Sequence, residues 1–141
     1  MIDKGDDRVE KTRTTRQKQL IADILKKAQS PLTATQVYAQ ATAISPSLAK
    51  STVYRNLEAM TKRGELERGF LETGESYFTV AGQGHHHYMI CRVCNRMQDL
   101  PSCPMAHLEE AIVADCGFVP IDHAVQVYGY CRECAADKLT K

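Results

Sequence analysis

Apolar side chains recur every three or four residues in three stretches of the first half of the chain, which is the spacing of an amphipathic helix. The first stretch begins near Thr15, a candidate N-cap, and a Ser-Pro pair ends it. Thr33 and Gln36 form a capping box before the second stretch, and Gly64 follows the third. The pattern therefore predicts three short helices, whose apolar positions are Leu20, Ile21, Ile24, Leu25 and Ala28, then Val37, Ala41 and Ile44, then Val53, Leu57 and Met60.

The pattern changes to β-strand character in residues 65–80. Two β-prone runs flank a turn that contains Gly74, which predicts a hairpin. Three helices with tight turns followed by a hairpin indicate a winged helix-turn-helix, although a three-helix protein with an incidental hairpin has the same pattern. Residues 1–11 are polar and are predicted to be a frayed tail.

A second, smaller unit is predicted after residues 81–84, whose two glycines are typical of a hinge. A helix is expected from Pro104 to Cys116, with Ser102 as its N-cap. Strand character surrounds it at residues 88–91, 97–100 and 124–128. The expected fold class is α+β, with a winged helix-turn-helix domain at 1–80, the hinge at 81–84 and a small α/β domain at 85–141.

Four of the six cysteines form two Cys-x-x-Cys pairs, Cys91/Cys94 and Cys131/Cys134, separated by 36 residues. Each pair presents two thiolates to one ion, so the two pairs together complete a closed tetrahedral zinc site, which is a structural site. Two disulfides, or a thioredoxin-like redox pair, are the alternatives. The first terminal residues lack an apolar leader, which favours a cytoplasmic location with reduced thiols, and no βαβ pattern supports a redox pair.

The five histidines, all of which follow residue 84, predict a second metal site. On a strand, His85 and His87 point to one face and His86 to the other, so the first two can chelate one ion. Further donors in this half are His123, Cys103 and His107. A mixed nitrogen and sulfur ligand set favours zinc, and it suits iron or manganese less well as the sulfur content rises. Cys116, at a helix end, is expected to be a buried small apolar residue.

Charge is unevenly distributed, although the net charge of the chain is only +1. Residues 11–63 contain ten Lys or Arg and two acids, whereas acids outnumber bases seven to five from residue 81 onward. A basic first half predicts a polyanion partner, most often nucleic acid, with a solvated helical surface as the alternative. No segment approaches the roughly 20 apolar residues of a membrane span, so no membrane partner is expected.

Several motifs in the chain resemble the ferric uptake regulator family. They are Arg13-x-Thr15, Ser51-Thr-Val-Tyr-Arg-Asn-Leu57, Gly64-x-Leu66-Glu67, His85-His-His-Tyr-Met-Ile-Cys91 with Cys94, and Val127-Tyr-Gly-Tyr-Cys131 with Cys134. The resemblance covers nearly the whole chain and implies a homodimeric, metal-activated repressor with an N-terminal winged helix and a C-terminal dimerisation domain. The segment Ser102-Cys-Pro-Met105 looks most like the zinc uptake regulator branch.

The resemblance also implies a sensor site. It places His85, His87 and His123 on three ligands of that site. The acidic fourth ligand of the family falls on Ala106 in this chain. Cys103 is therefore expected to take the fourth position, with His107 as the second choice.

A further family site is matched here only by His86 and Asp99, with Glu67 as an additional candidate ligand. Tyr88 stands where the family has a histidine and Thr79 where it has an acid, so this site is expected to be degraded. The peroxide-sensing branch of the family depends on iron held there, which argues against that branch.

DNA contact is expected to centre on the third predicted helix, as the resemblance also implies. Arg55 can pair bidentately with guanine, and Tyr54 can contact a thymine methyl unless it packs within the helical core. The remaining candidates are Thr52 on the same helix, and Arg13, Arg16 and Lys18 on the first helix, which are expected to contact phosphates or the minor groove.

The expected function is a zinc-dependent, DNA-binding transcriptional repressor of metal-uptake genes that acts on double-stranded operator DNA. The alternative within the family is an iron-responsive or peroxide-sensing regulator, with iron or manganese at the regulatory site. The alternative of another class is a zinc enzyme. Deaminases need His-x-Glu with Pro-Cys-x-x-Cys and metalloproteases need His-Glu-x-x-His, and the chain has neither motif. No catalytic residue, and no small-molecule substrate beyond the metal ion, is therefore expected.

Overall fold

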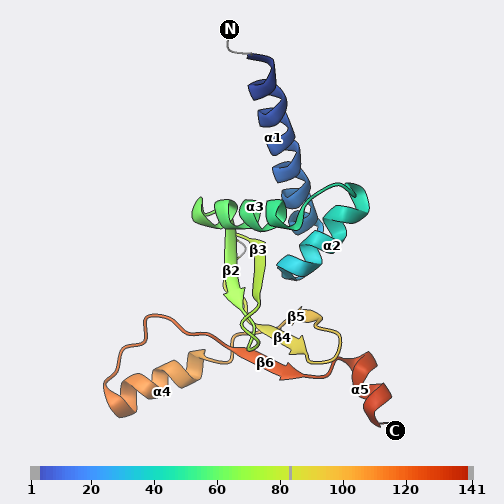
Figure 1. Ribbon diagram of the computed structural model, residues 1–141. Coiled ribbons are helices and arrows are strands. Elements are labelled where there is room, and N and C mark those ends of the chain that lie inside the picture. The colour runs from blue at the N-terminus through green and yellow to red at the C-terminus, as the bar shows by residue number, and fades with distance from the viewer. Residues whose placement is uncertain (1–3, 83, 140–141) are drawn as a thin grey trace. The chain divides into compact units, whose positions relative to one another are not determined.

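The computed structural model describes residues 4–82 and 84–139, and it divides into two compact units, Met1–Gly82 and Gln83–Lys141 (Figure 1). Residues 1–3 of the predicted tail and Gln83 of the predicted hinge lie outside the described residues. Both units combine helices with a small antiparallel or mixed sheet, so the predicted α+β class is confirmed.

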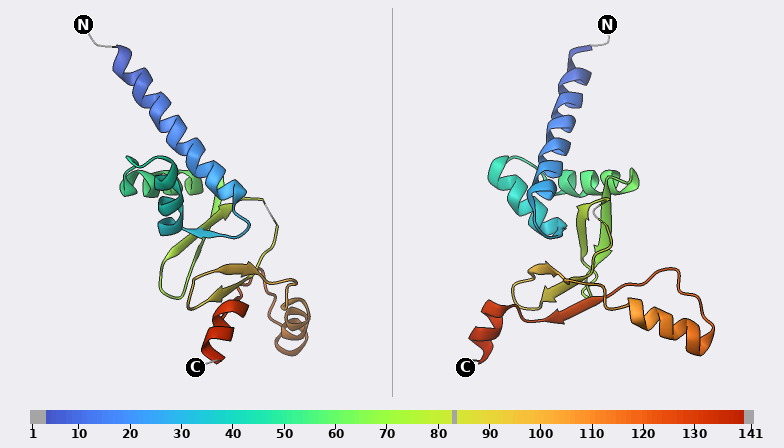
Figure 2. Two further views of the ribbon diagram at one scale, coloured as in Figure 1. Left: turned by 90° about the vertical axis from the view of Figure 1, so that its right-hand side faces the viewer. Right: turned by 180° about the vertical axis from the view of Figure 1, so that it is seen from behind.

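The first unit has the helix-helix-helix-hairpin order of a winged helix (Figures 1 and 2). Its strands pair in the order β1-β3-β2, and every pairing is antiparallel. The short strand β1, which lies between the first two helices, was not predicted from the sequence. The elements are α1 (Lys4–Lys27), β1 (Leu32–Thr33), α2 (Ala34–Ile44), α3 (Lys50–Lys62), β2 (Leu66–Phe70) and β3 (Ser76–Val80).

The core of this unit lies where the three helices meet the hairpin. Ile21 of α1, Val37 of α2, and Val53 and Leu57 of α3 are fully buried. Each such side chain contributes about 1.5–3 kcal/mol by leaving water. The predicted apolar face of α3 is therefore confirmed. Ile44 is 67% exposed, contrary to the prediction, because α2 ends at this residue and the chain turns away.

Local signals set most of the helix ends in this unit. The Gln36 amide donates to Thr33 Oγ1 at 3.2 Å, and the Thr33 amide donates to Gln36 Oε1 at 2.9 Å, so the capping box is confirmed. Gly64, with a φ of 77°, follows α3 in the left-handed conformation that favours glycine. The predicted start of α1 at Thr15 is wrong: the helix begins at Lys4, because no helix-breaking residue lies between Gly5 and Thr15.

The second unit is built on a three-stranded sheet in the order β5-β4-β6. β4 pairs antiparallel with β5 and parallel with β6, so that Tyr88 lies opposite Gln126 and Cys91 opposite Gly129. The elements are β4 (Tyr88–Cys91), β5 (Met97–Asp99), α4 (Ala106–Cys116), β6 (Gln126–Gly129) and α5 (Arg132–Leu139). The described residues of this unit that are buried are His87, Tyr88, Ile90, Cys91, Met97 and Cys131.

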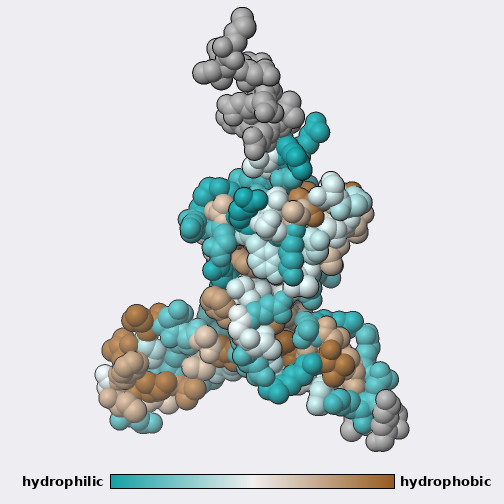
Figure 3. Space-filling model, in the orientation of Figure 1, coloured by the Kyte–Doolittle hydropathy of each residue, from teal (hydrophilic) through white to brown (hydrophobic). Residues whose placement is uncertain are grey.

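Helix α4 stands away from this sheet and has no buried residue (Figures 1 and 2). Its N-cap is Met105 rather than the predicted Ser102, and the cap makes no side-chain hydrogen bond. Cys116 is exposed, so its predicted burial is wrong. Figure 3 shows apolar residues gathered over α4 and the segment that follows it, and the large exposed ones are Leu108, Val113, Phe118, Val119 and Ile121.

Candidate metal centres and nucleic-acid interface

Four thiols of the second unit, the thiol cluster, converge on one point. Cys91 ends β4, Cys94 lies in the following turn, Cys131 follows β6, and Cys134 lies on α5. Their sulfur atoms all lie within 4.8 Å of one another, and the Sγ atoms of Cys94 and Cys131 are 3.8 Å apart. Zinc bound at about 2.3 Å by four sulfurs gives a tetrahedron whose edges are about 3.8 Å. The cluster therefore has the donors and the dimensions of a tetrahedral zinc site.

Backbone geometry brings the two Cys pairs together. The Asn95 amide donates to the carbonyl of Cys91 at 2.9 Å, and Asn95 has a φ of 60°, so the chain turns sharply after β4. The Arg92 amide donates to the Gly129 carbonyl at 2.8 Å, which extends the parallel pairing past Cys91. The second Cys pair follows directly after this contact. The parallel pairing of β4 and β6 thus explains how a 36-residue separation closes into one site.

Two of the four thiols, Cys91 and Cys134, have pKa values shifted in opposite directions. Backbone amides of Cys94 and Cys131 lower the pKa of Cys91 to about 6, which favours its thiolate. The hydrogen bond to Cys131, together with burial, raises the pKa of Cys134 to about 12. A second thiolate beside that of Cys91 is unfavourable unless a cation compensates the added negative charge. A dication is the species that removes this repulsion.

A second group, the His–Cys cluster, consists of His85, His87, Cys103 and His123. The Nε2 atom of His123 lies 2.8 Å from Nε2 of His85 and 3.0 Å from Nε2 of His87. The Sγ atom of Cys103 lies 3.3 Å from Nε2 of His123 and 3.4 Å from Nε2 of His87. A tetrahedral zinc ion bound at about 2.0–2.1 Å by nitrogen gives edges of about 3.3 Å between nitrogens. Four donor atoms therefore surround a space of the size that one ion needs.

Burial affects the protonation of His87, one member of the His–Cys cluster. His87 is only 5% exposed, and this burial lowers its pKa. The neighbouring His85 and His123 lower the pKa of His87 further. A lowered pKa favours the neutral imidazole, which is the form that binds metal. His107 is exposed and does not belong to the cluster, whereas Cys103 does.

The His85–His87 run precedes β4 and is not part of a strand, contrary to the prediction. The predicted separation of faces nevertheless appears in the structure. His86 lies against the ring of Tyr88, with centroids 6.4 Å apart, and its Nδ1 is 3.6 Å from Asp99 Oδ1. His86 thus has partners that differ from those of its two neighbours.

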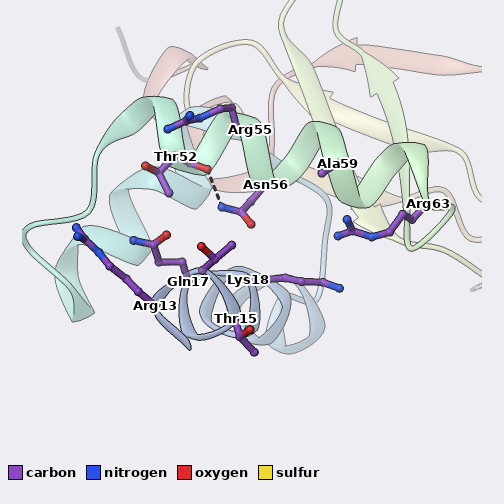
Figure 4. Close-up of a pocket in the computed structure, with 10 residues that line it drawn as sticks. Arg13, Thr15, Gln17, Lys18, Thr52, Arg55, Asn56, Ala59 and Arg63 are labelled. Carbon is purple, nitrogen blue, oxygen red and sulfur yellow. Dashed lines mark hydrogen bonds between the residues drawn. The ribbon is translucent and has the colours of Figure 1, made fainter. Parts of the chain in front are cut away.

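The first unit carries a basic groove between α1 and α3, with a volume of about 670 Å³. Figure 4 shows Thr52 and Asn56 of α3 directed toward Gln17 of α1, with Arg13 and Lys18 also at the groove. No acidic side chain lines it, and four cationic ones do, which makes it a surface suited to a polyanion. The lining residues are Arg13, Thr14, Thr15, Gln17, Lys18, Thr52, Arg55, Asn56, Ala59 and Arg63.

Two predicted DNA-contact residues lie outside this lining. Arg16 is an exposed residue of α1. Tyr54 is 40% exposed, with the Lys50 ammonium 5.8 Å from the centre of its ring. Val53 and Leu57 fill the buried face of α3, so Tyr54 is not packed within the helical core. Among the described residues, no helix is long and apolar enough to span a bilayer.

Comparison with known proteins shows the family of the chain. A sequence profile of the ferric uptake regulator family matches residues 10–128. The chain belongs to this family. Its members are dimeric DNA-binding transcription regulators with a metal ion as effector, and they are not enzymes. The partners of this chain are therefore DNA and a second copy of itself, and the zinc-enzyme alternative is set aside.

Two relatives and one structure show how similar family members are. The Ferric uptake regulation protein of Bordetella parapertussis is 30% identical over 115 residues, which cover 81% of this chain and 83% of that protein. The protein of the same name from Neisseria gonorrhoeae is 28% identical over 117 residues, which cover 82% and 81%. The structure of the ferric uptake regulator of Francisella tularensis with iron matches with a TM-score of 0.73 at 25% identity, covering 84% of this chain and 91% of that one.

The third candidate ligand set, Glu67, His86 and Asp99, is divided between the two units. His86 and Asp99 belong to the second unit, and Glu67 is an exposed residue of β2 in the first unit, opposite Thr79.

Sequence reasoning missed two acidic residues next to the candidate sites. Glu65 Oε1 accepts hydrogen bonds from Arg63 Nε at 2.9 Å and from Lys18 Nζ at 3.2 Å, and these two bases lower the pKa of Glu65. Glu109 of α4 lies against the ring of His123. The second contact had a signal in the sequence, because Glu109 is one helical turn after Ala106, the position at which the resemblance implies an acidic ligand.

Proposed function

We propose that this protein is a zinc-responsive repressor of metal-uptake genes, acting in the cytoplasm on double-stranded operator DNA. The proposal narrows the family's general function, metal-responsive regulation of transcription, to one ion. The observation that carries it is the sulfur atom of Cys103, which lies 3.3 and 3.4 Å from two histidine nitrogens of the His–Cys cluster. A thiolate among imidazoles favours zinc over iron and manganese, which prefer harder oxygen donors.

The two clusters would have different roles in this regulator. The thiol cluster, with four sulfurs and no open position, suits a permanent structural zinc. The His–Cys cluster suits a regulatory zinc, because His85 is exposed and the ion can therefore exchange with solution. The degraded third set, Glu67, His86 and Asp99, has no assigned role in the proposal.

The basic groove would hold the sugar-phosphate backbone of DNA, and α3 would enter the major groove. Arg55 and Tyr54, both exposed on α3, would contact base edges, with Thr52 beside them. Arg13, Lys18 and the exposed Arg16 of α1 would contact phosphates. A dimer would present two such helices to successive major grooves, about 34 Å apart.

Metal binding would control DNA binding through the segment that joins the units. His85 and His87 follow residues 81–84 directly, so capture of an ion by these histidines fixes one end of that segment. We propose that this restricts the winged helices of the dimer to arrangements that fit the operator. About 5.5 kcal/mol of differential binding would take such an equilibrium from 1:99 to 99:1, which several metal–ligand bonds can supply.

The proposal is tested by measuring operator binding against free zinc for the parent protein, His87→Ala and His86→Ala, on a duplex selected from a random pool. His87→Ala removes a buried ligand and should raise the zinc concentration for half-maximal binding by at least about tenfold, because a coordinating nitrogen is lost. His86→Ala, the matched control next to it, should change that concentration less than about twofold. Loss of the zinc response in His86→Ala, with the response retained in His87→Ala, would assign zinc sensing to the face of the segment that carries His86.

An iron-responsive regulator is the second candidate, because the relatives named above are ferric uptake regulation proteins. The same titration with Fe²⁺ and Mn²⁺ under anaerobic conditions separates the two candidates. Half-maximal operator binding at a free Fe²⁺ concentration within the cellular range, and at no comparable zinc concentration, would replace zinc by iron as the effector.

A further inference from the structure

Glu109 lies on the outer side of the His–Cys cluster and not among its ligands. Its Oε1 atom is 2.5 Å from Nδ1 of His123, and both side chains are partly buried, at 33% and 16% exposure. The opposite nitrogen of the same ring, Nε2, is the one that faces His85, His87 and Cys103. His123 therefore connects the carboxylate to the cluster through a single imidazole ring.

This contact decides which nitrogen of His123 carries a proton. A carboxylate can only accept a hydrogen bond, so Nδ1 of His123 must be the donor. In a neutral ring the lone pair then lies on Nε2, which points into the cluster. The negative charge behind the ring also increases the electron density that Nε2 can donate to a cation.

Charge balance supports the same role. A dication held by three neutral imidazoles and the thiolate of Cys103 would retain one net positive charge. Cys103, His87 and His123 are all at least partly buried, so such a charge is poorly solvated. Glu109 supplies the compensating negative charge from just outside the ligand shell. Glu109 lies on α4, whose bounds are Ala106–Cys116.

We propose that Glu109 is a positioning residue that sets the affinity of the His–Cys cluster for zinc by orienting His123 and by neutralising the charge of the bound ion from outside the ligand set. This inference rests on the proposed function, since it requires that the cluster binds zinc. The proposal also gives helix α4, which carries an exposed apolar surface, a role in metal sensing.

The test compares zinc affinity, measured by competition with a chromophoric chelator, in the full-length parent protein, Glu109→Gln, Glu109→Leu and Glu110→Gln. Loss of a supporting carboxylate behind a ligating histidine typically weakens metal binding about 10–100-fold. Glu109→Leu should show this loss, and Glu109→Gln, which keeps an acceptor without the charge, should lie between Glu109→Leu and the parent. Glu110→Gln, an exposed neighbour on the same helix, should stay within about twofold of the parent.

A second readout separates positioning from a general effect on folding. Nitrogen-15 spectra of the histidine rings report which nitrogen of His123 carries the proton. In the zinc-free proteins, the parent should show the Nδ1-protonated ring of His123, and Glu109→Leu should show a mixture of both tautomers. Equal zinc affinity in the parent and Glu109→Gln, or an unchanged His123 tautomer in Glu109→Leu, would overturn the inference alone. A parent protein that binds no zinc beyond the thiol cluster would instead overturn the proposed function.

Discussion

Cys103 is the residue on which the proposed choice of metal depends. It lies in the segment between β5 and α4, and its sulfur approaches two histidine nitrogens within 3.4 Å. Oxygen ligands at the same position would suit iron or manganese, whereas sulfur selects softer ions. On the proposed function, the choice between zinc and iron would thus depend on the side chain of Cys103.

Cobalt substitution makes the role of Cys103 visible. The protein with cobalt in both clusters should show sulfur-to-cobalt charge-transfer absorption from five sulfurs, because Cys103 adds one thiolate to the four of the thiol cluster. Cys103→Ala should lose the contribution of the second cluster and bind its zinc at least about tenfold more weakly. Cys116→Ala, which removes an exposed thiol outside both clusters, is the control and should leave the spectrum unchanged. An unchanged spectrum in Cys103→Ala would show that no sulfur atom binds metal in the His–Cys cluster.

Ligand spacing along the chain predicts part of the site and not the rest. His85 and His87, two residues apart, point the same way for local reasons, and the structure brings both to the cluster with His123 and Cys103. The place of Glu109 one helical turn after Ala106 was a signal that the sequence offered, but its contact with His123 also depends on how the segment between α4 and β6 returns to the sheet. Cys116 was misjudged because α4 turned out to have no buried side at all.

At the scale of elements, α3 combines a fully buried face with an exposed face of opposite character. Val53, Leu57 and Met60 hold it to the core, so the exposed Arg55 and Tyr54 are fixed in orientation without taking part in packing. A helix that is held to the core by one face and presents exposed polar side chains on the other is well suited to reading base edges.

Arg55→Ala and Lys18→Ala should weaken DNA binding in different ways. Arg55→Ala should remove about 1–3 kcal/mol of discrimination at a defined base pair, because a bidentate contact to guanine is lost. Lys18→Ala should weaken all sequences alike and reduce the salt dependence, because it removes a phosphate contact. Binding to operator and scrambled duplexes over a range of salt concentrations separates these effects, with Lys26→Ala, outside the groove, as the control. Unchanged operator binding by Arg55→Ala at equal salt and zinc would remove α3 as the reading helix.

Elements that depend on local chemistry were predictable. The capping box of α2, the glycine stop of α3 and the hairpin were read correctly, because each signal lies within a few residues. The early start of α1 and the strand β1 were missed. In the case of β1, the two residues Leu32–Thr33 gain strand geometry only from pairing with Phe78 and Tyr77, which lie more than 40 positions away.

At the scale of the whole chain, the two units differ in what stabilises them. The first unit has an extensive apolar core drawn from three helices and the hairpin. In the second unit the described buried residues are few, two of them are cysteines of the thiol cluster, and the apolar residues of α4 are exposed. We therefore expect the second unit to depend on a bound metal and on a second copy of the chain for its stability.

Cys91→Ser should accordingly affect the second unit far more than the first. Metal content should fall from about two zinc ions per chain to about one or fewer, because a site of four thiolates contributes folding energy directly. The protein should become monomeric by sedimentation, and the thermal unfolding transition of the second unit should disappear while that of the first remains. Cys116→Ser serves as the control. A Cys91→Ser protein that keeps its zinc, its dimer and its thermal stability would exclude the thiol cluster as a structural site.

The parallel pairing of β4 with β6 also has a consequence for how the protein is made. The β4–β5 hairpin and its Cys pair can form as soon as they are synthesised, whereas β6 must return across a long loop, and Cys131 lies 37 positions after Cys94. Such non-local contacts form slowly, since loop closure precedes the gain in contacts. On the proposal that zinc occupies the thiol cluster, a nascent chain holds a half-formed site until Cys134 has been made. The zinc supply during synthesis would then determine what fraction of the regulator reaches its folded form.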